Sequence, residues 1–113
     1  MPITNAQLRT HEFLQLMYED EYYPDHLVEL GKAILVRLCE RIEAEQPGDL
    51  AALYVLTHAA TEEFNDLEGE FCAGGSEFDT VAREWIGEEF WILANAYGFH
   101  DADSEELIAT REW

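Results

Sequence analysis

The chain has 113 residues, and 25 Asp and Glu against six Lys and Arg give it a formal net charge of −19. This charge excludes direct binding to nucleic acid and to anionic membranes, because both depend on Lys and Arg. It does not indicate disorder, because 48% of the residues are hydrophobic and 12% are aromatic. We therefore expect one folded domain that spans residues 1–113.

The first two helices are predicted from apolar spacing and from residues that start or stop a helix. The first is expected from Thr4 or Thr10 to Tyr18, and Thr4 with Gln7 has the spacing of a capping box. Pro24 suits the first turn of the second helix, which Pro47-Gly48 closes. The apolar side chains of the second helix recur at steps of three and four residues: Leu27, Leu30, Ile34, Leu35, Leu38 and Ile42.

The third helix has the most regular apolar pattern of the chain. Asp49 is expected to cap its start, and the loop Ala73-Gly74-Gly75 follows its end. Its core positions lie 3, 4, 4, 3 and 4 residues apart: Leu53, Leu56, Ala60, Phe64, Leu67 and Phe71. This spacing predicts a helix with one buried face.

The fourth helix is expected to start at a cap formed by Ser76 and Asp79 and to stop at Gly98. A short last helix from Ser104 to about Arg111 follows the cap Asp103. The sequence shows no alternating β pattern of useful length and no internal repeat. It therefore predicts an all-α fold, a compact bundle of four main helices plus a short C-terminal helix.

Two features of the fourth predicted helix are unusual. Glu89 falls in the middle of its core stripe, where it either reaches water, as is more common, or is buried with a partner. Arg37, Arg41 and His58 are the candidate partners. A second apolar strip is typical of a central helix or of a contact surface, and its members are Gly87, Phe90, Trp91 and Ala94.

The predicted polar cluster consists of His58, Glu62, Asn65 and Glu89. The first three, together with Thr61, gather at helical spacing on the side of the third helix opposite its apolar face. His58 and Glu62, four residues apart, could share a metal or form a base with its orienting carboxylate. A solvated helix face is the commoner meaning of such a pattern, and the sequence names no third metal ligand. We expect no metal and no cofactor.

The acidic residues are unevenly distributed. Residues 1–50 carry a net charge of −6, residues 51–113 carry −13, and no Lys or Arg occurs between Arg41 and Arg83. A solubilising surface would explain this pattern, and so would a docking face for a basic protein. The predicted acidic face of the third helix consists of Glu62, Glu63, Asp66, Glu68 and Glu70.

The compartment is predicted from the N-terminus, the apolar runs and the cysteines. The first residues show neither the basic nor the apolar region of a signal peptide, and no apolar run is long enough for a membrane span. Cys39 and Cys72 form no CxxC motif, so we expect buried free thiols rather than a disulfide. These features predict a cytoplasmic protein.

Short segments along nearly the whole chain resemble a family of short acidic bacterial cytoplasmic proteins of unassigned function. The segments are Tyr22-Tyr23-Pro24, Thr57 to Asn65, Ala82-Arg83-Glu84, Tyr97-Gly98-Phe99 and Arg111-Glu112-Trp113. The resemblance implies a bacterial cytoplasmic protein and supplies no catalytic residues. In charge, size and helical class, the chain is also similar to bacterial immunity proteins that neutralise basic nuclease toxins, which is an analogy and not a shared motif.

The sequence favours a non-enzymatic acidic binding protein with an immunity-type or inhibitory role toward a basic partner protein. In this hypothesis the acidic face pairs with Lys and Arg of the partner, and Gly87, Trp91 and Trp113 provide the interface anchor. One alternative is a DNA mimic that occupies a DNA-binding protein. Another is a small metal-dependent enzyme centred on His58, Glu62 and Glu89. A homodimer through Gly87 and Trp91 is compatible with each of them.

Overall fold

A computed structural model describes residues 3–113, and within this range the chain forms six α-helices and no strand. Three helices are long, α3 (Asp25–Glu45), α4 (Leu50–Ala73) and α5 (Thr80–Ala96). Three are single turns, α1 (Ala6–Arg9), α2 (Gln15–Tyr18) and α6 (Ser104–Leu107). The predicted all-α class is confirmed, whereas the predicted count of four main helices plus one is wrong.

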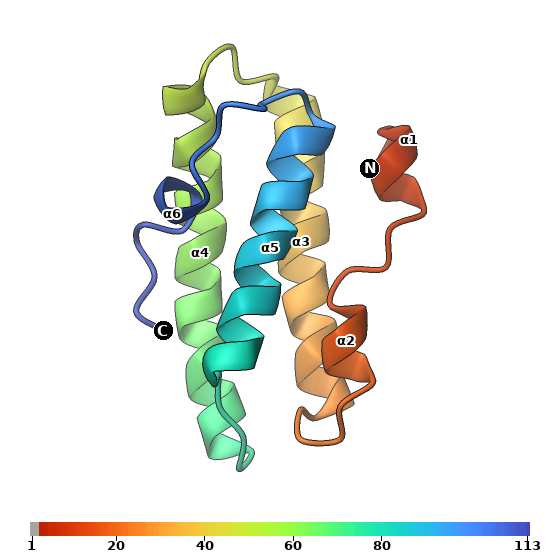
Figure 1. The fold of residues 1–113 in the computed structure, drawn as a ribbon, viewed down its shortest axis with the longest axis vertical. Coiled ribbons are helices and arrows are strands. Elements are labelled where there is room, and N and C mark those ends of the chain that lie inside the picture. Colours follow the sequence, from red (N-terminus) through yellow and green to blue (C-terminus); the bar gives the residue numbers. More distant parts are fainter. Residues whose placement is uncertain (1–2) are drawn as a thin grey trace.

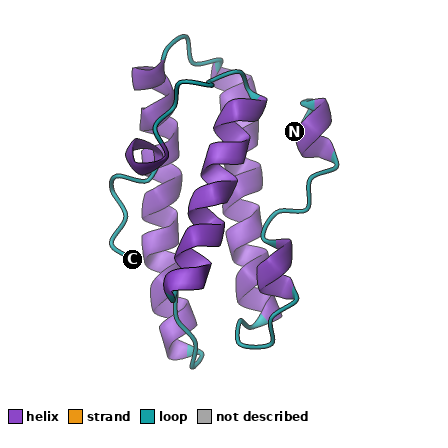
Figure 2. Cartoon of the chain, in the orientation of Figure 1, coloured by secondary structure: helices purple, strands orange, loops and turns teal. Residues whose placement is uncertain are grey.

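The three long helices form the body of the domain. α3 and α4 stand side by side and α5 lies in front of them, while α2 lies beside α3 and α6 beside α4 (Figures 1 and 2). The predicted apolar face of α4 is buried at all six positions, and it packs on α3 and α5. α5 contacts α1, α2, α3 and α6, and Phe90 and Ala94 of its second apolar strip are buried, as in a central helix, whereas Trp91 of the same strip stays exposed.

Side-chain caps fix where the long helices begin. The Asp49 carboxylate accepts the N–H of Ala52 at 2.8 Å, as predicted. At α5 the cap is Asp79 alone, which accepts the N–H of Ala82 at 2.9 Å, while Ser76 is buried and makes no cap. Gly98 adopts the predicted left-handed conformation, with φ of 89°.

The predicted first helix is wrong, because residues 10–14 bend between α1 and α2. Its expected capping box is also absent, since Asn5 caps α1 by accepting the N–H groups of Gln7 and Leu8. Leu14 turns the chain with a left-handed backbone, φ 58°, which is unfavourable for a leucine. With this bend, four apolar side chains of the segment reach the core, one from each short helix and two from the bend itself: Leu8 of α1, Met17 of α2, and Phe13 and Leu14.

The C-terminal helix is shorter than predicted and ends at Leu107 instead of near Arg111. Asp103 caps it as expected, by accepting the N–H of Glu105 at 2.9 Å. Turns then lead to Trp113, which lies in the core. None of the helices in the described chain has the length and apolarity needed to cross a bilayer.

The two cysteines differ in their surroundings. Both are free, and Cys39 is buried, where burial raises the pKa of its thiol to about 12. Cys72 is exposed near the end of α4, so the expectation that both thiols are buried is wrong for this residue.

Candidate partner-binding site

Four of the five acids of the predicted face form one exposed strip along α4. At 100° per residue their positions fall within about 100° of one another on the outward side of the helix. This acidic strip consists of Glu62, Glu63, Asp66 and Glu70. Glu68 is half-buried and lies on another flank of α4, so it does not extend the strip.

The α4 sequence contains no Lys or Arg, but arginines of the neighbouring helix α3 lie close to its acids. Arg37 of α3 donates to Glu63 at 2.7 Å. One turn further along α3, Arg41 pairs with Glu45 at 3.0 Å. All four side chains are about half exposed, so each pair contributes little to folding and exchanges readily with other charges.

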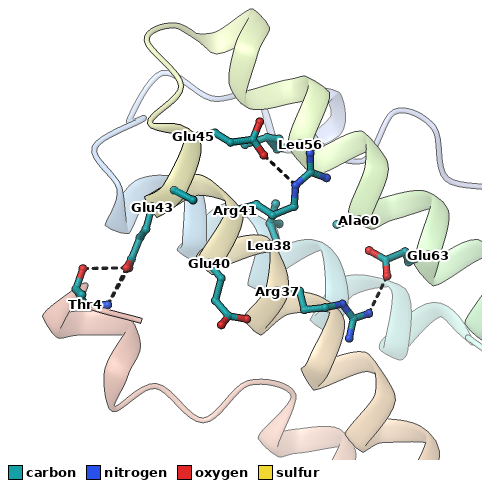
Figure 3. A pocket seen from close by; sticks show the side chains of 11 residues that line it. Thr4, Arg37, Leu38, Glu40, Arg41, Glu43, Glu45, Leu56, Ala60 and Glu63 are labelled. Carbon is teal, nitrogen blue, oxygen red and sulfur yellow. Dashed lines mark hydrogen bonds and ion pairs between the residues drawn. The ribbon is translucent and has the colours of Figure 1, made fainter. Parts of the chain in front are cut away.

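Beside the acidic strip, α3 and α4 enclose a groove of about 580 Å³, shown in Figure 3. Its floor is apolar and comes from Leu38, Leu56 and Ala60. Four glutamates and two arginines surround the floor: Glu40, Glu43, Glu45, Glu63, Arg37 and Arg41. An apolar floor with a mostly acidic rim suits a segment that carries both apolar and basic side chains.

At one end of the groove, Glu43 holds the N-terminal segment onto α3. Its carboxylate accepts the N–H groups of Thr4 and Asn5 and the hydroxyls of Thr4 and Tyr97, the last at 2.5 Å. Burial opposes ionisation of this carboxyl, but these hydrogen bonds outweigh it and lower the pKa of Glu43 to about 2. The groove is therefore closed at this end by a fixed anion.

We expect Glu43→Gln to lower the free energy of unfolding at pH 7 by about 1 kcal/mol, because the amide keeps only part of these hydrogen bonds. The pKa of Glu43 is lower in the folded chain than its ordinary 4.5. The stability that it contributes is therefore present above pH 4.5 and is lost as the pH falls toward 2. Urea denaturation at several acidic pH values should show a shallower loss for Glu43→Gln than for wild type.

The matched control for this prediction is Glu45→Gln, which removes an exposed glutamate of the same helix that is paired only with Arg41. Its acid unfolding should follow that of wild type. Identical acid curves for Glu43→Gln and Glu45→Gln would contradict the role given to Glu43.

The structure does not bring the four predicted polar-cluster residues together. Glu62 lies exposed on the acidic strip. His58 and Asn65 instead bind the backbone of the C-terminal segment. His58 Nε2 lies 2.7 Å from the carbonyl oxygen of Glu106. The Asn65 carboxamide accepts the N–H of Glu112 at 2.8 Å and donates to the carbonyl of Thr110 at 3.1 Å. These two side chains hold the chain's own C-terminus.

Glu89, the fourth member, is buried in the middle of α5, with 8% of its surface exposed, and does not reach water as the commoner interpretation had it. Its partner is His11, whose Nε2 lies 3.0 and 3.1 Å from the two carboxylate oxygens, and not Arg37, Arg41 or His58. The N–H of Leu14 donates to the same carboxylate at 3.3 Å. Burial raises the pKa of Glu89, although His11 and this N–H oppose the shift.

The predicted interface anchors lie in different surroundings. Trp91 is 44% exposed on α5, four residues beyond Gly87. Trp113 is only 8% exposed, with its ring against Phe64 and Phe78, so it is a core residue and offers no free face to a partner.

Residues 3–113 contain no group of three or more His, Cys, Asp and Glu side chains that could hold a metal ion. His58 contacts the C-terminal backbone and Glu89 contacts His11, so the residues named for the metal-dependent alternative each have another contact in the chain.

Sequence reasoning missed the groove between α3 and α4. Two features of the sequence were consistent with it. Arg41 and Glu45 have the four-residue spacing of an ion pair on one helix, and Arg37 lies one turn before Arg41. What could not be seen was the alignment of α3 with α4, which places Arg37 opposite Glu63.

Residues 7–113 match the model of a family of unknown function (DUF5713). The resemblance to a family of unassigned function is thereby confirmed over nearly the whole chain. No curated protein and no solved structure matches the chain.

Proposed function

This chain belongs to the family of unknown function DUF5713, and we propose that it is a non-enzymatic acidic binding protein that docks on a basic partner protein. The most concrete form of this role is inhibitory or immunity-type, in which the docked chain blocks a functional surface of its partner. The observation that supports the proposal is the acidic strip of α4 running beside an apolar-floored groove. A cytoplasmic location is part of the proposal.

The charge arrangement explains how such docking would proceed. The four carboxylates of the acidic strip attract Lys and Arg of the partner over several ångströms and speed the encounter. On contact, a partner cation competes with Arg37 for Glu63, which costs little because the existing pair is half exposed. Side chains of the partner then enter the groove, where Leu38 and Leu56 are already only 2% and 3% exposed, so the contact is made mainly with the charged rim.

The test compares wild type with a variant of the acidic strip, Glu62→Gln, Glu63→Gln, Asp66→Asn and Glu70→Gln. Each form is used to capture proteins from the source cell at low salt, and the captured protein is purified and its association rate measured. We expect the variant to bind at least about tenfold more slowly, because electrostatic steering depends on these charges. Raising the salt concentration should slow wild type toward the variant.

The matched control removes four exposed acids outside α4, by Glu12→Gln, Glu19→Gln, Glu21→Gln and Asp101→Asn. It has the same net charge as the strip variant and should associate nearly as fast as wild type. If association slowed equally in both variants, the effect would come from net charge and not from the acidic strip. Unchanged binding of the strip variant would refute the docking face. Displacement of the partner by duplex DNA would instead support the DNA-mimic alternative.

A further inference from the structure

A second groove, of about 540 Å³, lies between the outward face of α5 and the C-terminal segment. It shares no lining residue with the groove between α3 and α4. Figure 1 shows α5 nearest the viewer, with α6 beside it and no helix in front of it. On one side of the groove, α5 presents three residues spaced four apart on one helix face, Arg83, Gly87 and Trp91. Ile108 and Arg111 line the opposite side.

Gly87 stands in the middle of α5, where glycine destabilises a helix relative to alanine. The packing of the chain itself does not require it, because a Cβ there would meet only Ile108 Cδ1, at an ordinary 3.5 Å. Gly31 of α3 differs, since a Cβ there would come within 3.0 Å of Leu14 Cδ1. A glycine that is not needed inside the monomer permits close approach of a backbone from outside.

Trp91 and Arg83 lie on either side of this glycine. Trp91 is one of the large apolar side chains that stay exposed. The Nε–H of Arg83 donates to the carbonyl of Phe78 at 3.0 Å, which fixes the guanidinium beside the groove. Asp79 is the acid that its charge reaches, since the pKa of Asp79 is lowered by the hydrogen bond from Tyr23 and further by Arg83, but no described carboxylate lies within ion-pair distance of the guanidinium. A guanidinium held in place and an open indole attract each other when they are brought face to face.

We propose that a second copy of this chain docks in this groove, with the two α5 helices antiparallel and crossing at Gly87. In this arrangement a residue four positions before the crossing faces one four positions after it, so each Arg83 meets the Trp91 of the other copy. The groove also carries both signs of charge, because Arg83 and Arg111 lie beside Glu84, Glu88 and Glu105, and Arg111 pairs with Glu105 at 3.4 Å. A face with both signs can meet its own copy, whereas the acidic strip of α4 can only repel itself.

The net charge of −19 predicts how this dimer responds to salt. Two such chains repel each other, and screening shortens the range of that repulsion to about 4 Å near 0.5 M salt. The dimer should therefore strengthen as salt is added, whereas docking on a basic partner should weaken. The opposite signs separate this inference from the proposed function, on which it does not depend.

Sedimentation of the full chain in about 0.05 M and about 0.5 M NaCl tests the dimer. We expect a weak dimer, with a dissociation constant on the order of tens of micromolar at the higher salt, because one helix and one groove wall bury less than a standard interface. Trp91→Ala and Gly87→Leu should each raise the dissociation constant at least about tenfold. Val55→Ala, which removes a 66% exposed apolar side chain of α4, should leave it unchanged.

Cysteine cross-linking tests the crossing point. In a Cys72→Ser background, Gly87→Cys should form an intermolecular disulfide under mild oxidation faster than Val55→Cys, although residue 55 is the more exposed of the two. Gly87→Ala supplies a check on folding, because it should raise the melting temperature through better helix propensity. A monomer at both salt concentrations, a dimer that Trp91→Ala and Gly87→Leu leave intact, or faster cross-linking at residue 55 would overturn the proposal.

Discussion

Replacing Glu89 with alanine is expected to lower the free energy of unfolding by about 3 kcal/mol. The carboxylate joins two parts of the fold, because it extends from α5 to His11 and to the N–H of Leu14, which both lie in the bend between α1 and α2. Alanine leaves a cavity, an unpaired His11 and a buried N–H without an acceptor. Leu14 also loses the hydrogen bond that holds its left-handed backbone, so the bend between α1 and α2 loses its support.

Urea denaturation at pH 7 measures this effect, and Glu89→Gln is its matched control. Glutamine keeps the shape and one oxygen that can accept a hydrogen bond, so we expect it to cost about 1 kcal/mol. If Glu89→Gln lowered the free energy of unfolding as much as Glu89→Ala, the negative charge, and not the hydrogen bonding, would hold the N-terminal segment. A loss well below 1 kcal/mol in Glu89→Ala would contradict the role given to this carboxylate.

The pH dependence gives the same prediction a second readout. The pKa of Glu89 is raised above its ordinary 4.5, first by burial and further by the nearby Glu88, against the opposing effects of His11 and Leu14. The folded chain thus holds this proton more tightly than the unfolded chain. The part of the stability that comes from binding this proton is fully present below pH 4.5 and is lost as the pH rises through the raised pKa, whereas the contacts of the carboxylate with His11 and Leu14 still contribute at pH 7. Wild type should therefore lose stability relative to Glu89→Gln over that range, opposite in sign to the effect of Glu43.

The parts of the fold that the sequence predicts well are those fixed by local spacing. The regular steps of the α4 apolar face and the cap at Asp49 depend only on neighbours along the chain, and both are confirmed. The bend at Leu14 depends on Glu89, 75 residues further on, and no local pattern could indicate it. Tertiary contacts decided that segment against a reasonable helix prediction.

The candidate site shows the same division. The exposed acids of α4 follow from the position of its apolar face, so the acidic strip was predictable except for Glu68. The predicted polar face at His58 and Asn65 is instead half-buried against the C-terminal segment, and Thr61 of the same face is fully buried. Hydrogen-bonding side chains that hold a partner cannot be told from those that hold the chain's own backbone until the C-terminal segment is placed against them.

Replacing Trp113 with alanine is expected to lower the free energy of unfolding by about 3 kcal/mol, near the lower end of the range for a buried aromatic ring. The ring lies 5.9 Å from Phe78 and 6.3 Å from Phe64, and Arg111 lies over it at 5.7 Å. Its loss opens the core between α4 and α5. It also removes one of the contacts that hold the C-terminal segment in place, in addition to the hydrogen bonds of His58 and Asn65. Thermal and urea unfolding of the variant measure the loss.

Trp113→Phe distinguishes packing of the ring from the role of its polar atom. The indole N–H is buried and finds no acceptor among the described residues, which costs about 1–3 kcal/mol. Phenylalanine removes that donor while it keeps most of the apolar contact, so the two effects should nearly cancel. Asn65→Ala should destabilise the chain by about 1 kcal/mol, because it frees the backbone of Thr110 and Glu112. If Trp113→Ala instead left stability unchanged and weakened only partner binding, the ring would be the exposed anchor that the sequence suggested, because a core residue cannot be removed without cost to folding.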